Sequence, residues 1–421
     1  MESVPETFSD IFLGRQPLID RQQAVIAYEL LFRDTAENVS RISSAREATA
    51  DVVCKAFAEL GLANALGKQR AFINVDEDFV CQDAVEFLPK QTVLLEVDAS
   101  TEVTPRLLER CRELKHIGYE FSISGITGIS EPVNQLLHLA SYSKVDVNAV
   151  LPTGSMSALL SKLRNSHTKL IANRIESAEE KQRCTDLGFD IFQGYYFAHP
   201  VIVEGRRLDA SQQGLIRLIN LAAANADLDK IESAFKSEPG LAINLLRLTN
   251  SAGAGLSVRI SSIRHAVTVV GLRQIQRWLT LLMFSHAGST SNLTNNPLLQ
   301  LAALRGCFME LAAYRCFPNK RDLRDPAFIT GLMSFMPAAL GMSMGDILSQ
   351  ISTTNDVRLA LSRREGDLGL LLELTERFDN EDVKGTAELL KRVGNKVTLQ
   401  TLGLCLSETI AWVQQLGMEA D

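Results

Sequence analysis

The chain has 421 residues, of which 46% are hydrophobic, and a formal net charge of −7. This length exceeds what one hydrophobic core usually serves, so two domains are predicted. The acidic balance argues against sequence-independent nucleic-acid binding, which needs clustered positive charge to displace counterions. Seven scattered cysteines contain no C-x-x-C pair. A reducing compartment is therefore favoured over a disulfide framework or a thiolate zinc site.

The N-terminal sequence M-E-S-V-P-E-T-F-S-D is acidic and lacks the basic and apolar regions of a secretion signal. No uninterrupted apolar stretch approaches the ~20 residues that cross a bilayer as a helix. We therefore expect a cytoplasmic protein with no membrane insertion.

Short β-rich runs alternate with helical runs from Phe12 to about Pro200. Such alternation predicts βαβ units and a mostly parallel sheet, here a modified, trimmed TIM-like βα barrel, because roughly 190 residues are few for eight units. The predicted strands are Ala24–Phe32, Arg70–Val75, Thr92–Val97, Tyr119–Ser124, Ser143–Val147, Lys169–Arg174 and Asp190–Ala198. The predicted helices are Ala45–Leu66, Pro105–His116, Val133–Ala140 and Ser177–Leu187.

After about Arg206 the strand-like alternation stops and helical spacing takes over, which predicts domains at 1–205 and 206–421. Ser237 and Ser262 are suited to cap helices, and Gly271 is suited to end one. A Met-rich apolar segment at 331–344 suits core packing or an adaptable partner surface. Further predicted helices are Leu298–Cys316, Ala327–Leu340, Val357–Ser362, Gly366–Arg377, Val383–Val393 and Leu399–Leu416.

Polar residues lie at or just after the ends of several predicted strands. They are Glu29, Asn74, Glu96, Lys144, Asp146, Glu176 and Gln193. In a βα barrel the C-terminal strand ends carry the active-site groups. An isolated residue of this kind can also be a hydrogen-bonding rim residue, and only the joint order points to a site. Between Glu96 and Lys144 an acidic strand end is missing, since the chain reads F-S-I-S-G-I-T-G there.

These motifs resemble the EAL domain, a family of barrel phosphodiesterases that linearise cyclic di-GMP with two divalent cations. The run Y-E-L-L-F-R resembles the signature that names the family, and F-Q-G-Y-Y-F-A-H-P resembles its last strand. The resemblance implies metal-ligand positions at Glu29, Asn74 and Glu96 and a ligand-contacting arginine at Arg33. It also matches Lys144 and Asp146 to the lysine–x–aspartate strand of the family, and Gln193 to its last strand.

The departures from the EAL pattern fall at the metal positions. The paired aspartates that bridge the two cations align with Ser124 and Gly125, and a further glutamate aligns with Asn173. Two divalent cations need hard, mostly anionic oxygen donors close together. We therefore expect no catalytic residue and no cofactor, with magnesium or manganese held only as a single weakly bound ion.

The second half resembles the HDOD domain, a helical relative of the HD phosphohydrolases that lacks their metal chemistry. The similar stretches are E-P-G-L-A-I-N-L-L-R-L-T-N-S-A and R-I-S-S-I-R-H-A-V-T-V-V-G-L. Ser334 and Phe335 stand where the His-Asp pair is expected. No histidine follows His286, so the C-terminal helices offer no imidazole to a metal.

The order of the domains is similar to that of bacterial EAL–HDOD signalling proteins. The resemblance implies a catalytically inactive signal-transduction protein that acts by contacting other signalling proteins. One alternative is a cyclic di-GMP receptor that uses Arg33 and Gln193 without hydrolysis. The other is a residual cyclic di-GMP phosphodiesterase.

Overall fold

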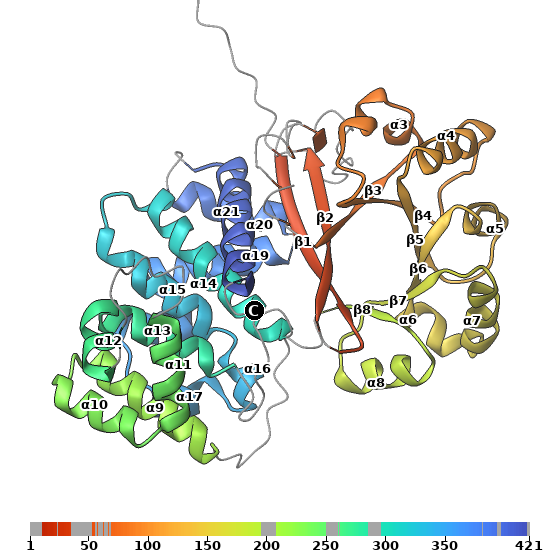
Figure 1. The fold of residues 1–421 in the computed structure, drawn as a ribbon. Coiled ribbons are helices and arrows are strands. Elements are labelled where there is room, and N and C mark those ends of the chain that lie inside the picture. The colour runs from red at the N-terminus through yellow and green to blue at the C-terminus, as the bar shows by residue number, and fades with distance from the viewer. Residues whose placement is uncertain are drawn as a thin grey trace, which may run out of the picture. The chain divides into compact units, whose positions relative to one another are not determined.

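A computed structural model shows a closed β-barrel and an array of helices (Figure 1). It describes residues 11–22, 24–34, 53–54, 57, 62, 66, 69–194, 208–249, 260, 262–284, 296–380, 382–393 and 397–418. The chain forms two compact units, Met1–Phe197 with Arg377–Ala411 and Ala198–Glu376 with Trp412–Asp421. The domain boundary at 205/206 stays a prediction, because the structure groups a C-terminal segment with the barrel.

Eight strands form the barrel in sequence order. They are β1 (Ile11–Asp20), β2 (Val25–Asp34), β3 (Arg70–Val75), β4 (Val93–Asp98), β5 (Glu120–Ile126), β6 (Ala140–Asp146), β7 (Lys169–Asn173) and β8 (Ile191–Gln193). Strands β2 to β8 pair in parallel, whereas β1 is antiparallel to both of its neighbours, β2 and β8. The predicted α/β barrel is confirmed, and its trimming is seen in β8, which has only three residues.

The first strand is an element that sequence analysis missed. Pro17 lies inside β1, and proline normally weighs against a strand because it cannot donate to the ladder. A tight hairpin nevertheless joins β1 to β2, since Asp20 N donates to Ala24 O at 2.9 Å and Ala24 N donates to Asp20 Oδ1 at 2.8 Å. Leu18, Ile19 and Asp20 then pair with β8 and close the ring.

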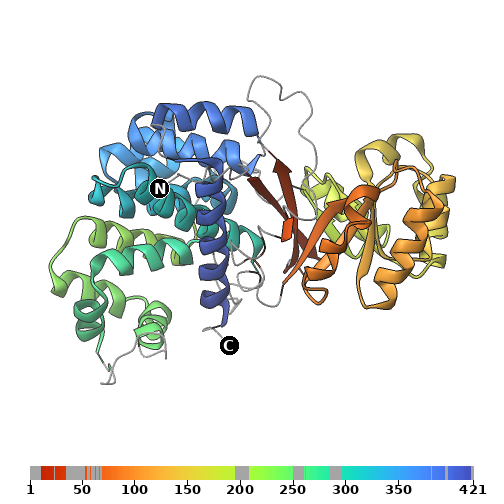
Figure 2. The same ribbon diagram turned by 90° about the horizontal axis from the view of Figure 1, so that it is seen from above.

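Short helices surround the barrel on its outer side (Figures 1 and 2). They are α3 (Glu77–Val80), α4 (Pro105–His116), α5 (Glu131–Leu137), α6 (Val147–Val150), α7 (Met156–Asn165) and α8 (Ala178–Asp186). The predicted bounds of α4 are confirmed at both ends. Its start is fixed by the Thr104 side chain, which accepts a hydrogen bond from Leu107 N, and by Pro105, which suits the first turn. The helix predicted over 45–66 lies mostly outside the described residues.

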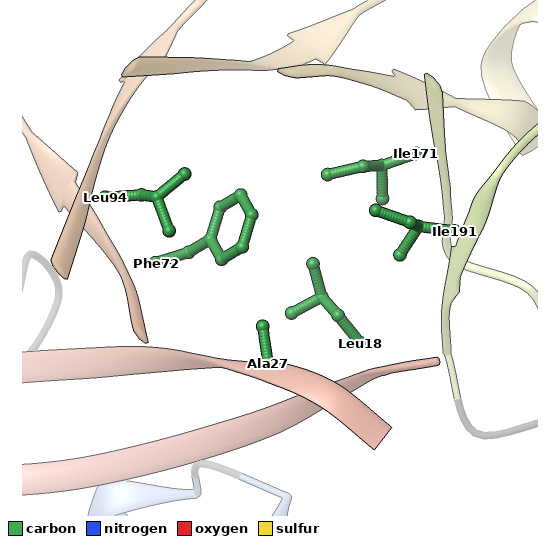
Figure 3. Close-up of a cluster of buried hydrophobic side chains, with 6 residues drawn as sticks. All are labelled: Leu18, Ala27, Phe72, Leu94, Ile171 and Ile191. Carbon is green, nitrogen blue, oxygen red and sulfur yellow. The ribbon is translucent and has the colours of Figure 1, made fainter. Parts of the chain in front are cut away.

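The centre of the barrel is an apolar layer (Figure 3). It is formed by one side chain from each of six strands, namely Leu18, Ala27, Phe72, Leu94, Ile171 and Ile191. Tyr142 of β6 packs against it, with its ring 5.3 Å from that of Phe72. Side chains two residues apart on the same strand point to the same face. The residues two positions further along these strands therefore form the next layer inside the barrel.

The second unit is built from helices, together with the end of the chain. Its helices are α9 (Ala210–Ala223), α10 (Leu228–Lys236), α11 (Pro239–Thr249), α12 (Ile263–Val270), α13 (Leu272–Leu282), α14 (Pro297–Cys316), α15 (Arg324–Met333), α16 (Met336–Leu340), α17 (Met344–Gln350), α18 (Asn355–Arg363), most of α19 (Gly366–Asp379) and the end of α21 (Leu399–Met418). The helix α20 (Val383–Val393) and the larger part of α21 belong to the first unit. In the described parts, no single helix is long and apolar enough to cross a membrane, although the bent pair Arg321–Leu340 and Met344–Gln350 passes by length and composition.

The helix predicted over Ala327–Leu340 is two helices, α15 and α16. Pro337 explains the break, because it lacks an N–H and its ring would clash with the carbonyl of Met333, where α15 ends. The predicted cap is confirmed at Ser262, whose hydroxyl accepts from His265 N at 3.2 Å. The Met-rich segment is mostly core, since Met333 and Met336 are buried.

Candidate functional site: a buried polar cluster at the barrel strand ends

A polar layer lies one step further along the strands than the apolar layer. On the parallel strands, each member stands two residues after an apolar one, as Asn74 follows Phe72 and Glu96 follows Leu94. The antiparallel β1 reverses this order, so that Gln16 precedes Leu18 by two residues. The layer therefore gathers residues from six strands, namely Gln16, Glu29, Asn74, Glu96, Lys144 and Gln193.

Glu29 is the hub of this layer. Its Oε1 accepts from Asn74 Nδ2 at 2.8 Å. Its Oε2 accepts from Lys144 Nζ at 3.0 Å and from Gln193 Nε2 at 2.5 Å. Gln193 Nε2 also donates to Gln16 Oε1 at 2.9 Å, which ties the hub to the antiparallel strand. Both oxygens of the Glu29 carboxylate are therefore held by side chains of the barrel.

Lys144 joins Glu29 to a second carboxylate. Its Nζ donates to Glu96 Oε1 at 2.6 Å, and the Lys144 and Glu96 side chains are each only 1% exposed. Burying charges is costly, and the cost is repaid only when the charges are paired and hydrogen-bonded. Among the described residues, the buried Gln193 Oε1 accepts no hydrogen bond, whereas the Ser122 side chain hydrogen-bonds to Glu96 and opposes the rise in its pKa that burial causes. The cluster thus holds one cation, two carboxylates and spare acceptor capacity.

The environment shifts the pKa of each charged member. Burial alone would raise the pKa of Glu29, but Lys144 and the hydrogen bonds lower it below its ordinary value. Burial raises the pKa of Glu96 to about 7, against the attraction of Lys144 and with added repulsion from Glu29. Burial would lower the pKa of Lys144, yet the two carboxylates raise it. Lys144 is therefore charged at neutral pH, and Glu96 is the member that takes up a proton.

The other predicted site residues lie outside the cluster. Asp146 caps α6 by accepting from Ala149 N at 3.2 Å and pairs with Arg174 at 2.9 Å. Glu176 is exposed, and its backbone N–H donates to the Glu180 carboxylate. The side chain of Arg33 lies outside the described residues.

The three positions without a carboxylate each have another structural use. Ser124 is buried and its carbonyl accepts from Ala99 N at 2.8 Å. Gly125 has φ +65°, and a Cβ there would lie 2.8 Å from Asp98 Oδ2. Asn173 Oδ1 accepts from the next backbone amide, Arg174 N, at 2.8 Å. None of these positions offers a carboxylate to the cluster.

The cluster does not fit a two-metal centre. Two divalent cations need several anionic oxygens, whereas Glu29 and Glu96 supply two carboxylates and share them with the Lys144 ammonium. Within the described ranges, no group of three or more His, Cys, Asp or Glu side chains could hold a metal ion. The described residues of the barrel therefore lack the donor set that two-metal hydrolysis requires.

Sequence reasoning missed Gln16 because β1 itself was missed. The signal was the Q-P-L order, in which a polar residue precedes an apolar one by two on a strand of opposite direction. Arg174, the partner of Asp146, was also missed, because a loop arginine carries no pattern of its own.

The position of the expected His-Asp pair in the helical unit is held by other contacts. The Ser334 hydroxyl donates to Gly331 O at 2.7 Å and accepts from Arg305 Nη1 at 3.1 Å. The Arg305 guanidinium lies 3.9 Å from the centre of the Phe335 ring. Gly331 is required there, because a Cβ would lie 2.8 Å from the Cα of Gly306 on α14. Arg305 thus packs against the two residues that the sequence analysis matched to the missing His-Asp pair.

Comparison with known domains agrees with this helical architecture. Residues 212–365 match the HDOD domain, and this span runs from α9 to just beyond α18. The helical unit contains an HDOD domain. Its Ser334–Arg305 contact lies within the matched span.

Two curated relatives match nearly the whole chain. The uncharacterized protein YuxH of Bacillus subtilis is 27% identical over 96% of this chain and 98% of its own length. The cyclic di-GMP phosphodiesterase CdgJ of Vibrio cholerae is 27% identical over 98% of this chain and 94% of its own. The expected pairing of a βα barrel with an HDOD domain is confirmed.

A standalone EAL protein from Vibrio cholerae O395, solved in a cyclic di-GMP-bound form, is similar to the barrel part of this chain. It is 21% identical with a TM-score of 0.37, and the match covers 47% of this chain and 93% of that chain.

Proposed function

We propose that this protein is a signalling protein whose barrel does not hydrolyse cyclic di-GMP and whose output is contact with other proteins. The observation that supports the first part most strongly is the absence of a carboxylate at Ser124, Gly125 and Asn173, three positions where the resemblance places metal ligands. The two carboxylates that remain, Glu29 and Glu96, are both paired with the Lys144 ammonium.

Hydrolysis of a phosphodiester needs an activated water and compensation for the charge of the substrate. Two metal ions usually supply both. The cluster has one buried ammonium, which supplies a single positive charge where two divalent ions would supply four. Positions 124, 125 and 173 add no carboxylate. The cluster therefore suits structural support of the rim better than catalysis.

The second part of the proposal concerns where partners bind. Three large apolar side chains are exposed on three consecutive helices of the HDOD domain, namely Leu228 on α10, Ile243 on α11 and Val269 on α12. These helices pack against one another. Exposed apolar side chains on packed neighbouring helices are common in protein-binding surfaces. We therefore assign partner contact to the α10–α12 surface.

Two alternatives involve cyclic di-GMP itself. The name of the relative CdgJ favours a phosphodiesterase. A receptor would bind the nucleotide at the rim without hydrolysis. A thermal-shift titration with cyclic di-GMP, run in EDTA and in manganese, separates them, because a ligand that binds only the native state must raise the melting temperature. The proposal predicts no shift in EDTA. A nucleotide-dependent shift in EDTA would establish the receptor instead.

The partner assignment is tested with matched surface variants of the full chain. Ile243→Asp and Val269→Asp place charges on the α10–α12 surface. Phe87→Asp, at a side chain that is 84% exposed on the barrel unit, is the control. We expect proteins that the wild-type chain captures from bacterial lysate to be lost with the first two variants and retained with the control. Loss with Phe87→Asp alone would move the partner surface to the barrel unit.

A further inference from the structure

The helical unit holds an open cavity of about 510 Å³ beside helix α9. Cavities of roughly 300–1,000 Å³ are the size that small molecules occupy in proteins. The described lining comes from α9 and its flanks, with Leu208 before the helix and Leu221 in its last turn, and from Gln350, the last residue of α17. We propose that this cavity binds a small aliphatic carboxylate, with its apolar body inside and its carboxylate on Arg217. The proposal goes beyond the signalling role, because it concerns a small molecule rather than a protein partner.

Helix α9 presents two different stripes of side chains. One stripe is buried in the core and consists of Leu215, Leu218, Ile219 and Ala222. The other lines the cavity and consists of Gln213, Ile216, Arg217 and Asn220, spaced three or four residues apart as one helical face requires. Leu208 and Leu221 add two further apolar side chains to this lining. The cavity thus offers apolar walls and one positive charge.

Two amide side chains of the lining hold its walls in place. Asn220 Nδ2 donates to Gln350 O at 2.9 Å, and Asn220 Oδ1 accepts from Ser352 N at 2.8 Å. Gln213 Nε2 donates to Leu208 O at 3.0 Å. The first two bonds join α9 to the end of α17, and the third fixes the backbone that enters α9. These contacts preorganise the cavity, which lowers the entropic cost of binding a ligand.

Arg217 is the group in this lining that is left to bind a ligand. Its side chain is exposed, and among the described residues no hydrogen bond or ion pair engages it. None of the described lining residues is acidic, so its charge has no counter-charge in the cavity wall. A guanidinium forms two parallel hydrogen bonds with a planar carboxylate. Charge complementarity therefore favours a ligand with one carboxylate.

The lining also indicates the body of the ligand. None of the described lining residues is aromatic, so the cavity lacks the stacking surfaces on which nucleobases bind. Its apolar side chains are the aliphatic Leu208, Ile216 and Leu221. Burial of CH₂ groups against such side chains is favourable and needs no special geometry. An aliphatic body is therefore favoured over a nucleotide.

The test is isothermal titration calorimetry of the full chain with octanoate as the probe. Octanamide is the matched probe, because it keeps the apolar body and lacks the charge. The wild type should bind octanoate more tightly than octanamide, by about fivefold or more. Arg217→Gln should bind both probes with the same affinity. The exposed Arg363→Gln, at the end of α18, is the control and should keep the preference for octanoate.

The length of the probe tests the apolar part of the cavity. Affinity should rise from butyrate to octanoate, by up to about fourfold for each CH₂ group that the cavity buries. Because Arg217 is exposed, Arg217→Gln should melt as the wild type does, so that a lost preference reports binding rather than unfolding. Three results would each overturn the proposal: no octanoate binding by the wild type, octanoate that binds no tighter than butyrate, or an Arg217→Gln chain that still prefers octanoate to octanamide.

Discussion

The ammonium of Lys144 and the carboxylate of Glu96 lie 2.6 Å apart, with each side chain only 1% exposed. This pair links β6 to β4 through the interior of the barrel, and Glu29 extends it to β2. Removing one partner of a buried ion pair typically costs about 3–5 kcal/mol, because the other charge is left uncompensated. Losing either partner should therefore destabilise the barrel, whether or not the cluster takes part in chemistry.

The stability of the protein should depend on pH through Glu96. Burial raises its pKa from the ordinary 4.5 to about 7, so between these values the folded chain holds a proton that the unfolded chain releases. The stabilisation is complete below pH 4.5 and is lost as pH rises through about 7, by up to about 3 kcal/mol. Urea denaturation at pH 5 and at pH 7.5 should show this loss in the wild type and a smaller one in Glu96→Gln. The exposed Glu109→Gln is the control. A Glu96→Gln protein that loses as much stability as the wild type between pH 5 and pH 7.5 would contradict the assignment.

The backbone beside Gln193 should tolerate no side chain at Gly194. A Cβ there would lie 2.0 Å from Ile175 O and 2.5 Å from Ile175 N, and both are backbone atoms that cannot move aside cheaply. We expect Gly194→Ala to lower the free energy of unfolding by more than about 2 kcal/mol. Gly128→Ala is the matched control, since nothing lies within 4 Å of its added Cβ. Equal urea midpoints for the two variants would show that the contact is relieved at little cost.

The missing carboxylate at position 125 should be costly to restore. Gly125 has φ +65°, which asparagine and aspartate tolerate better than other side chains, and its Cβ would meet Asp98 Oδ2 at 2.8 Å. Gly125→Asp should therefore be less stable than Gly125→Asn by roughly 0.5–1 kcal/mol, because only the aspartate adds a like charge. The difference should shrink in high salt. If Gly125→Asp is the more stable variant in low salt, the Asp98 carboxylate does not oppose a second carboxylate at position 125.

In the HDOD domain, Arg277 should resist replacement by lysine. Its guanidinium donates to both oxygens of Glu310, at 2.9 and 2.5 Å, and lies 3.6 Å from the Phe328 ring centre. Lysine keeps the charge but not the planar fork, so Arg277→Lys should cost about 1–2 kcal/mol. Arg273→Lys, at a side chain that is 82% exposed with one contact to Asp325, should change stability by less than about 0.5 kcal/mol. Thermal unfolding of both variants would test the difference, and similar costs would contradict it.

Much of the barrel could be predicted because its strands carry a simple pattern. An apolar residue is followed two positions later by a polar one, as in Leu94 and Glu96, so periodicity placed both the strands and the cluster on one face. The first strand, β1, was not predicted, because Pro17 weakens the strand signal and because the antiparallel direction of β1 reverses the order of apolar and polar residues. Gln16 was missed with it.

The contacts inside the cluster could not be predicted from the sequence. Motif order placed Lys144 and Glu29 at the same rim, but their separation depends on the register of the strands from β2 to β6 and on how deep each side chain lies. Asp146 shows the same limit, because a helix cap and Arg174 hold it. Its position in a strand motif did not reveal those partners.

The most direct test of the account is hydrolysis of cyclic di-GMP by the purified full chain in magnesium and in manganese, followed by chromatographic detection of the linear product. The account predicts the rate of buffer alone, because Ser124, Gly125 and Asn173 supply no carboxylate and too few donors remain for two metal ions. Glu29→Ala is the control for contaminating activity. Product formation well above buffer that disappears in Glu29→Ala would contradict the account.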